Sequence, residues 1–255
     1  MRLTADSASA CSASPPADRG NSRSATLNPA QNHLVDLLPR PDRLRLLALC
    51  EPFELVPGTV LCEPGNPTRH VYFPTEGFVS LLGLNHDSPD LEVGIVGGEG
   101  MLGAAVALGV ATARLRLLVQ GAGSAWRIGT EMFQRELERI APLRGCVNRY
   151  LYVLMAQMTS ACACHRFHPI GPRMARWMLM IQDRARCDSF QVTQETLAYR
   201  LGVRRVGITN AACVLQRSGL IEYRRGKMTV RDRGGLEAAA CGCYAADRQT
   251  YAELL

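Results

Sequence analysis

Apolar and polar positions repeat with two different periods along the chain, and the change of period separates regions of different secondary structure. Residues 53–128 carry short apolar runs, such as Val71 to Phe73 and Leu115 to Val119, separated by segments rich in Gly, Pro and Asn. Many short apolar runs at such spacing predict the strands of an antiparallel barrel or roll. Helical spacing precedes this block at residues 34–49, where prolines separate two short segments, and returns from Thr130 onward.

A longer helix is predicted to follow, with Pro142 in its first turn, where proline is tolerated. Along it, apolar residues recur at alternating four- and three-residue steps, which is the spacing of a coiled-coil seam. The seam consists of Val147, Leu151, Leu154, Met158 and Ala161. We interpret it as a dimer interface, because the seam is narrow and its helix joins two domains. An amphipathic helix packed on its own domain is the alternative.

The segment that begins at Thr193 carries the pattern of a helix-turn-helix. Thr193 is a suitable cap for a short helix, and Gly202 permits the left-handed turn that ends it. Ala198 is small where the two helices would touch, and Ile208 would fill the space between them. A second helix is expected to run from about residue 204 to residue 217.

A hairpin is predicted after this second helix. Two apolar strands flank a basic tip, residues 224–227, which contains a glycine. A helix-turn-helix followed by such a hairpin predicts a winged helix, and this combination is more specific than either part alone.

Positive charge is concentrated in the same part of the chain. Residues 172–235 contain thirteen Arg or Lys and five Asp or Glu, a net charge of +8. Because the whole chain carries +6, the remainder sums to −2. A basic domain joined to a nearly neutral one is typical of a protein in which one part binds a polyanion. A solvated basic face without a partner is the alternative.

The predicted second helix offers side chains that suit the edges of DNA bases. We expect its first half to enter the major groove, with Arg205 bonding guanine O6 and N7 and Asn210 bonding adenine N6 and N7. Thr209 is expected at a thymine methyl group or a phosphate. Arg204 and Arg217 lie on the same outward arc. The residues expected to contact phosphates, which position a protein without reading sequence, are Arg200, Arg224, Arg225 and Lys227.

With these features the chain resembles the Crp/Fnr family of bacterial regulators. The resemblance rests on Thr193–Ile221, in which Gly202-Val203-Arg204-Arg205 opens the second helix, and on the glycine-rich turn Gly97–Gly103. It covers about residues 34–245 and implies an α+β fold. The implied parts are a disordered tail (1–32), an antiparallel β-roll similar to cyclic-nucleotide-binding domains (33–140), a dimerisation helix (141–165), a winged helix-turn-helix (166–235) and a C-terminal helical tail (236–255).

The resemblance also implies a function and partners. It implies a transcription regulator that binds a palindromic operator in double-stranded DNA as a homodimer, contacts RNA polymerase and responds to an unidentified signal at the β-roll. Arg205 matches a base-contacting arginine of the family, whereas Val206 stands where a glutamate is often found, which indicates a different operator.

The resemblance places a candidate ligand site in the glycine-rich turn of the roll. The candidate residues are Gly98, Glu99, Gly100, Met101 and Arg114. Family members that bind cyclic AMP hold its phosphate with a Gly-Glu pair and a later Arg-Ser or Arg-Thr pair. The later stretch here reads Ala-Arg-Leu-Arg at residues 113–116, so neither a cyclic nucleotide nor any other cofactor is predicted.

Two C-x-C pairs could together supply soft metal ligands or a redox pair. They are Cys162-x-Cys164, which His165 follows, and Cys241-x-Cys243. Their spacing lacks the two-residue gap of zinc knuckles and the pairs are far apart, so no metal site is predicted, although a redox or metal role stays open. Residues 165–172 contain two prolines and a glycine and are predicted to form a hinge. The histidines of this segment, His165 and His168, are expected to cap or hydrogen-bond.

Other classes of function find little support in the residues. The chain has no Walker loop, no H-E-x-x-H and no nucleophile elbow, so we do not expect an enzyme. No apolar run approaches the roughly 18 residues of a membrane helix and the first residues do not form a secretory signal, so we expect a cytoplasmic protein. The alternative function is a ligand-binding or thiol-redox module that acts through protein contacts rather than through DNA.

Overall fold

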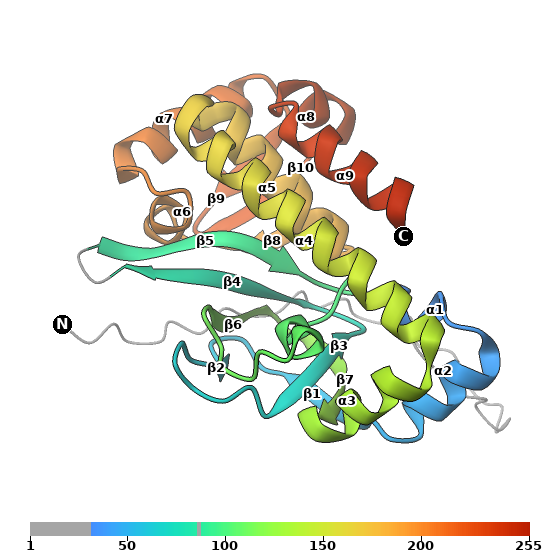
Figure 1. Cartoon of the computed structure of the whole chain (residues 1–255). Helices are drawn as coiled ribbons and strands as arrows, with labels where there is room; N and C mark the ends of the chain where they lie inside the picture. Colours follow the sequence, from blue (N-terminus) through green and yellow to red (C-terminus); the bar gives the residue numbers. More distant parts are fainter. Residues whose placement is uncertain (1–31, 86–87) are drawn as a thin grey trace, which may run out of the picture.

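The β-roll, a long helix and a winged helix follow one another in the computed structural model, which describes residues 32–85 and 88–255 (Figure 1). The expected tail, 1–32, lies outside the described residues except for Asn32. Asn32 is buried, and its side-chain amide donates to the carbonyl oxygens of Pro74 and Gly100 at 2.9 and 2.8 Å. Asn32 is therefore part of the folded roll, which corrects the boundary of the tail.

Two antiparallel sheets form the β-roll, as predicted. The first has the strand order β1-β7-β3, with β1 at Glu51–Leu55, β7 at Gly123–Gly129 and β3 at His70–Pro74. The second has the order β2-β6-β4-β5, with β2 at Val60–Cys62, β6 at Arg116–Gly121, β4 at Phe78–Asn85 and β5 at Ser88–Val96. Strand β7 was not predicted, because its buried residues Ala125 and Ile128 do not alternate with polar ones.

Short helices close the roll. They are α1 (His33–Asp36), α2 (Arg40–Leu47), the 3₁₀ helix η1 (Ala104–Leu108) and α3 (Thr130–Arg139). Asn32 caps α1 and Pro39 precedes α2, so the two short helices predicted around the prolines are present. The start of α3 at Thr130 also agrees with the sequence pattern.

Helix α4 (Ala141–Phe167) leads from the roll to the C-terminal domain. Pro142 lies in its first turn, as predicted. Its buried residues Val147 and Tyr150 pack on the roll. The helix continues into the predicted hinge, residues 165–172, so that only His168 and Pro169 separate it from α5 (Ile170–Ala185).

The C-terminal domain combines a helix-turn-helix with a small sheet. Its sheet has the order β8-β10-β9, with β8 at Ser189–Gln191, β10 at Lys227–Val230 and β9 at Ile221–Arg224. Its helices after α5 are α6 (Gln194–Arg200), α7 (Arg205–Arg217) and α8 (Arg233–Ala239). Two residues of the roll, Phe78 and Ile95, belong to the same apolar cluster as Met178 and Ile208, so the roll contributes to the core of the C-terminal domain.

The last helix, α9 (Cys243–Leu254), runs back beside α4 towards the roll (Figure 1). The Tyr251 hydroxyl donates to the carbonyl oxygen of Glu99 at 2.5 Å, and Arg149 Nε of α4 donates to the carbonyl oxygen of Leu254 at 2.9 Å. At the other end of the helix, Asp247 forms a buried ion pair with Arg176 of α5 at 2.6 Å. The tail thus contacts both domains.

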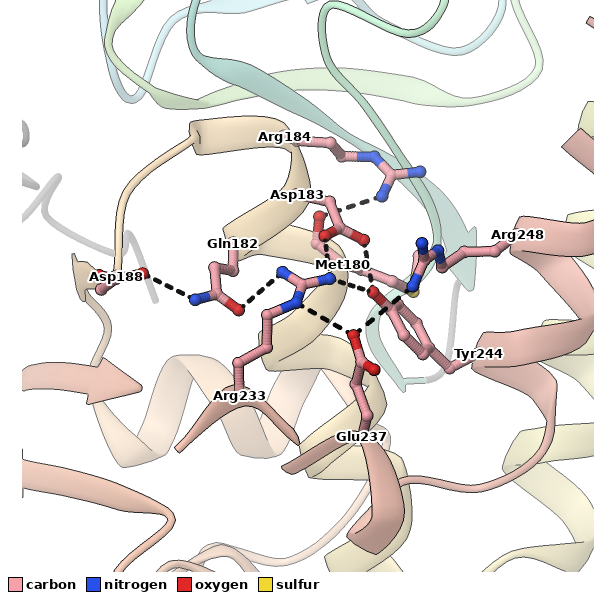
Figure 2. A network of polar contacts seen from close by, with 9 residues as sticks. All are labelled: Met180, Gln182, Asp183, Arg184, Asp188, Arg233, Glu237, Tyr244 and Arg248. Carbon is pink, nitrogen blue, oxygen red and sulfur yellow. Dashed lines mark hydrogen bonds and ion pairs between the residues drawn. The ribbon is translucent and has the colours of Figure 1, made fainter. Parts of the chain in front are cut away.

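A polar network centred on Arg233 of α8 attaches the same tail to α5 (Figure 2). Its guanidinium donates to Gln182 and Asp183 of α5 at 3.0 and 2.7 Å and to the Tyr244 hydroxyl of α9 at 2.8 Å. Glu237 accepts from the same guanidinium at 3.0 Å.

Among the described helices, none combines the length and apolarity needed to span a membrane.

Replacement of Ile208 by Ala is expected to lower the free energy of unfolding by about 2–5 kcal/mol, because this fully buried side chain fills the space beside α5 and α6. The matched control is Val214→Ala on the same helix, which is 58% exposed and should change the value by no more than about 0.5 kcal/mol. Urea unfolding followed by circular dichroism measures both. Equal losses for the two variants would contradict the packing described here.

Candidate nucleic-acid interface

The helix-turn-helix is built by local signals that the sequence predicts. The Thr193 hydroxyl accepts a hydrogen bond from the Thr196 amide at 3.0 Å and so caps α6. Gly202 ends this helix with φ of +61°, a left-handed conformation that favours glycine. Its Cα hydrogen faces Leu91 of β5, because a Cβ there would lie 3.0 Å from a Leu91 methyl carbon. A larger residue at this turn would meet both a strained backbone and the roll.

The angle between α6 and α7 is held by packing and by one polar contact. Leu197, Ala198 and Ile208 are all buried where the two helices meet, as the pattern predicts. The Thr209 hydroxyl of α7 donates to Gln194 Oε1 of α6 at 2.8 Å. Thr209 is thus half-buried and bonded within the motif, with its expected DNA contact remaining a prediction.

The outward arc of α7 carries most of the side chains predicted to read DNA. Ile208, Ala211, Ala212 and Leu215 bury the opposite side of this helix. The exposed side holds Arg204, Arg205, Asn210 and Arg217 together with Val206, Cys213 and Val214. Val206 is 63% exposed at the first turn of α7, beside Arg205. The helix therefore offers cationic and amide donors at its N-terminal end, with a branched apolar side chain between them.

The wing is a hairpin with a two-residue turn. Arg225 and Gly226 have φ of +49° and +79°, which is the pattern of a type I′ turn and matches the twist of the flanking strands. The exposed side chains of Arg224, Arg225 and Lys227 surround this tip. The Tyr223 hydroxyl donates to the carbonyl oxygen of Val192 at 2.9 Å and anchors β9. Burial raises the pKa of Tyr223, so the hydroxyl keeps its proton for this bond.

Comparison with known proteins identifies this region. The model of the family described as the Crp-like helix-turn-helix domain matches residues 172–239, which run from α5 to α8. These residues form a Crp-like helix-turn-helix domain. A search of curated proteins found no match to the chain.

Solved structures extend the likeness from the Crp-like domain to most of the chain. The c-di-GMP responsive global regulator CLP of Xanthomonas campestris is 20% identical, with a TM-score of 0.62 over 75% of this chain and 99% of its own. FixK2 from Bradyrhizobium japonicum is 13% identical, with a TM-score of 0.65 over 75% of this chain and 98% of its own. A CRP-family transcriptional regulator from Thermus thermophilus is 18% identical, with a TM-score of 0.61 over 74% of this chain and 96% of its own. At these identities the likeness establishes the fold, which is that of the Crp/Fnr regulators.

Arg200 does not lie with the exposed arginines of the Crp-like domain, which corrects its assignment as a phosphate contact. It is 8% exposed, and its guanidinium lies 3.7 Å from the buried carboxylate of Glu92 in β5 and over the Trp177 ring of α5. Burial lowers the pKa of Arg200, and the charge of Glu92 offsets part of this effect. Arg200 is buried because α6 packs on β5 of the roll through the face that carries this residue.

Glu92 is the centre of a polar contact between the roll and the Crp-like domain. Its carboxylate accepts from Trp177 Nε1 at 2.6 Å and from the Ser80 hydroxyl at 2.5 Å, in addition to facing Arg200. One strand side chain and two helix side chains thus complete the bonds of a buried anion, as burial of a charge requires. Sequence reasoning missed Glu92 because its partners lie on other elements, far away in the chain.

The glycine-rich turn does not gather the five predicted ligand residues into one site. Glu99 is ion-paired with Arg184 of α5 at 2.8 Å. Met101 is buried, and its carbonyl oxygen accepts a hydrogen bond from the Tyr150 hydroxyl at 3.1 Å. Arg114 is exposed in the loop before β6. A cavity of about 670 Å³ is lined by Glu99 and residues of α5 and α9, and the other predicted residues, Gly98, Gly100, Met101 and Arg114, do not line it. The carboxylate of Glu99 serves the contact between domains instead.

The seam predicted for dimerisation faces the chain's own roll. Val147 is 1% exposed in the core, and Leu151, Leu154 and Met158 are half-buried against the same apolar clusters. The alternative interpretation, an amphipathic helix packed on its own domain, describes these residues. The exposed stripe of α4 lies one residue further along and has the same spacing: Asn148, Tyr152, Met155, Thr159 and Cys162.

Replacement of Glu92 by Gln is expected to lower the free energy of unfolding by about 3–5 kcal/mol, because Arg200 would keep a buried charge without its counter-ion. Glu222→Gln provides the control, since Glu222 pairs with Arg231 at the exposed edge of the wing and should cost no more than about 1 kcal/mol. Denaturant titration of both variants measures the difference. A Glu92 variant as stable as the control would show that the interdomain contact contributes little.

Proposed function

We propose that this protein is a transcription regulator that binds a palindromic site in double-stranded DNA as a homodimer. The observation that carries the proposal is the exposed N-terminal half of α7, where Arg204, Arg205 and Asn210 face solvent while the opposite side of the helix is buried. A helix so placed in a helix-turn-helix fits the major groove. We infer that the protein acts in the cytoplasm, where it would also meet RNA polymerase.

The exposed polar residues divide into two roles. Arg205 and Asn210 suit bidentate bonds to guanine and adenine, and they carry the proposed base readout. Arg204, Arg217 and the wing residues Arg224, Arg225 and Lys227 suit phosphates, which position the protein and make affinity fall with salt. The hydroxyl of Thr209 is bonded to Gln194, so its methyl group is the part proposed to contact a thymine methyl.

The proposed dimer uses the exposed stripe of α4 rather than the buried seam. Tyr152 and Met155 are 61% and 65% exposed, although both are large apolar side chains. With Asn148, Thr159 and Cys162 they continue the four- and three-residue steps of a coiled-coil seam for about two heptads. In the dimer, the exposed stripes of the two copies would pack against each other and be buried. The face of α4 that packs on the roll would stay undisturbed.

A signal at the roll has two direct routes to the DNA-binding domain. Glu99 in the glycine-rich turn pairs with Arg184 of α5, and Glu92 in β5 contacts Trp177 of α5 and Arg200 of α6. We propose that the signal changes DNA binding by altering these contacts. A regulatory module that acts only through protein contacts would need neither the basic wing nor the exposed arc of α7.

Selection of bound fragments from random double-stranded DNA tests the function. We expect an inverted repeat whose half-sites are centred about 10–10.5 base pairs apart, or a multiple of this spacing, because two recognition helices must reach successive turns of the groove. Equal retention of all sequences would refute sequence-specific regulation. It would favour the alternative module that acts through protein contacts.

Replacement of Arg205 by Ala is expected to cost about 1–3 kcal/mol of binding free energy and to relax the preference at one base pair in each half-site. Lys227→Ala is the control for a phosphate contact, so it should weaken binding to all sequences alike and reduce the salt slope by about 1. Fluorescence anisotropy on the selected site and its single-base variants separates the two. Uniform weakening by the Arg205 variant would contradict base readout.

Replacement of Met155 by Glu is expected to convert the dimer to a monomer at micromolar concentration, because two carboxylates would face each other across the proposed seam. Met132→Glu, at a 38% exposed methionine of α3 outside the stripe, should leave the dimer intact. Sedimentation velocity measures both variants. Dimers formed by the Met155 variant would place the interface elsewhere.

A further inference from the structure

Four side chains from distant parts of the sequence converge where α4 meets the tail. They are Cys164, His168, Cys241 and Cys243, and their sulfur and nitrogen atoms all lie within 4.8 Å of one another. The sulfur atoms of Cys164 and Cys241 are 3.4 Å apart, and Cys243 Sγ lies 3.5 Å from His168 Nδ1. The proposed DNA-binding function uses none of these four residues.

Different elements position the four residues. Cys164 is on the last turn of α4, and His168 follows that helix as its C-cap. Cys241 lies between α8 and α9, and Cys243 is the first residue of α9. The cluster therefore joins the hinge before α5 to the tail after the wing. Cys164 and Cys241 are buried and the other two are half-buried, so the group is largely enclosed by protein.

The distances suit one metal ion better than a disulfide. Tetrahedral zinc with bonds of about 2.3 Å to sulfur separates neighbouring sulfur atoms by about 3.8 Å, close to the spacing seen here. A disulfide requires sulfur atoms about 2.05 Å apart and would use only two of the three thiols. Cys164, Cys241 and Cys243 form no disulfide in the structure. Three thiols and an imidazole also form a common ligand set of structural zinc sites.

Buried positive charge beside the cluster supports an anionic occupant. The charges of Arg173 and Arg176, both on α5 and both buried, act on Cys164 and Cys241. The Nε atoms of these arginines are buried without a hydrogen-bond partner. Three thiolates, one neutral imidazole and a divalent cation sum to −1. Arg173 would balance this charge, because Arg176 is already paired with Asp247.

We propose that Cys164, His168, Cys241 and Cys243 bind one Zn²⁺ ion that fastens the α8–α9 tail to the hinge of the DNA-binding domain. On binding, each of the three thiols transfers its proton to solvent and its sulfur forms a bond to the metal, while neutral His168 donates the lone pair of Nδ1. No electron is transferred. The proposal takes up the metal role that the sequence left open for the C-x-C pairs.

The residues that complete the site differ from those considered in the sequence. Cys162 is exposed on the opposite side of α4, and His165 contacts Arg173 at 2.5 Å instead of joining the cysteines. His168 stands four residues after Cys164, one helical turn away, and so reaches the same side. Helical geometry therefore selects Cys164 and His168 together and excludes their neighbours.

Metal analysis of the full-length protein, purified under reducing conditions without chelator, tests the proposal. We expect one zinc ion per chain and, after exchange with Co²⁺, the intense visible bands of tetrahedral cobalt together with thiolate-to-cobalt charge transfer. These readouts use the wild-type chain, so they do not depend on whether a variant folds. Failure to bind either metal would overturn the proposal, as would iron with acid-labile sulfide or a mass that shows a Cys164–Cys241 disulfide.

Variants locate the ion. C164S and the double variant C241S/C243S should lose zinc and the cobalt spectrum, and H168A should lose the tetrahedral spectrum. C162S is the matched control, because this thiol lies on the same helix outside the cluster, and it should keep one zinc ion per chain. Zinc retained by C164S, or lost by C162S, would contradict the assignment. DNA binding is not the readout, so a zinc-free protein that selects an operator would refute this site and leave the proposed function standing.

Discussion

A carboxylate buried in an apolar junction must be fully bonded, and this requirement determines where the DNA-binding domain lies on the roll. Glu92 meets it with Trp177, Ser80 and Arg200, which come from both domains. Moving the domain away would leave a buried carboxylate and a buried guanidinium to be solvated anew. The position of α7 in space, and so of its exposed Arg205 and Asn210, follows from this one contact together with the packing around it.

The tail gives the same junction a second support. Helix α9 contacts α4, α5 and the glycine-rich turn, and Asp247, Tyr251 and Arg233 each contribute a polar bond. The connection between α4 and α5 consists only of His168 and Pro169. A change in domain orientation therefore has to rearrange several contacts together, which is the kind of two-state element that a signal can bias.

Local signals in the sequence predicted most elements and the motif itself. Thr193, Gly202 and the basic hairpin tip act within a few residues of their own position, so their effect can be read without the fold. Arg200 was misassigned because its burial depends on Glu92, a residue of another domain. The partner of the predicted seam on α4 was undecided for a related reason. Two neighbouring stripes of the helix have the same spacing, and only the fold shows that the roll covers one of them.

The tail and the metal-ligating cluster were harder to predict. Nothing near Cys241 indicates that it returns to the end of α4, and the C-x-C spacing by itself favours no geometry. His168 was expected to cap or hydrogen-bond and its hydrogen bond to Cys243 agrees with that, but its position beside all three cysteines depends on the packing of α9. The features that could not be predicted from the sequence are those that depend on contacts between distant segments. Unusual local chemistry was not the obstacle.

The continuous apolar cluster that contains Phe78, Ile95 and Met178 has a consequence for how the chain loses its structure. Two domains with separate interiors can melt independently, one after the other. Here, opening the winged helix would expose part of the roll's interior to water, and opening the roll would do the same to α5. The two halves are thus thermodynamically coupled, and heat should disorder them as one cooperative unit.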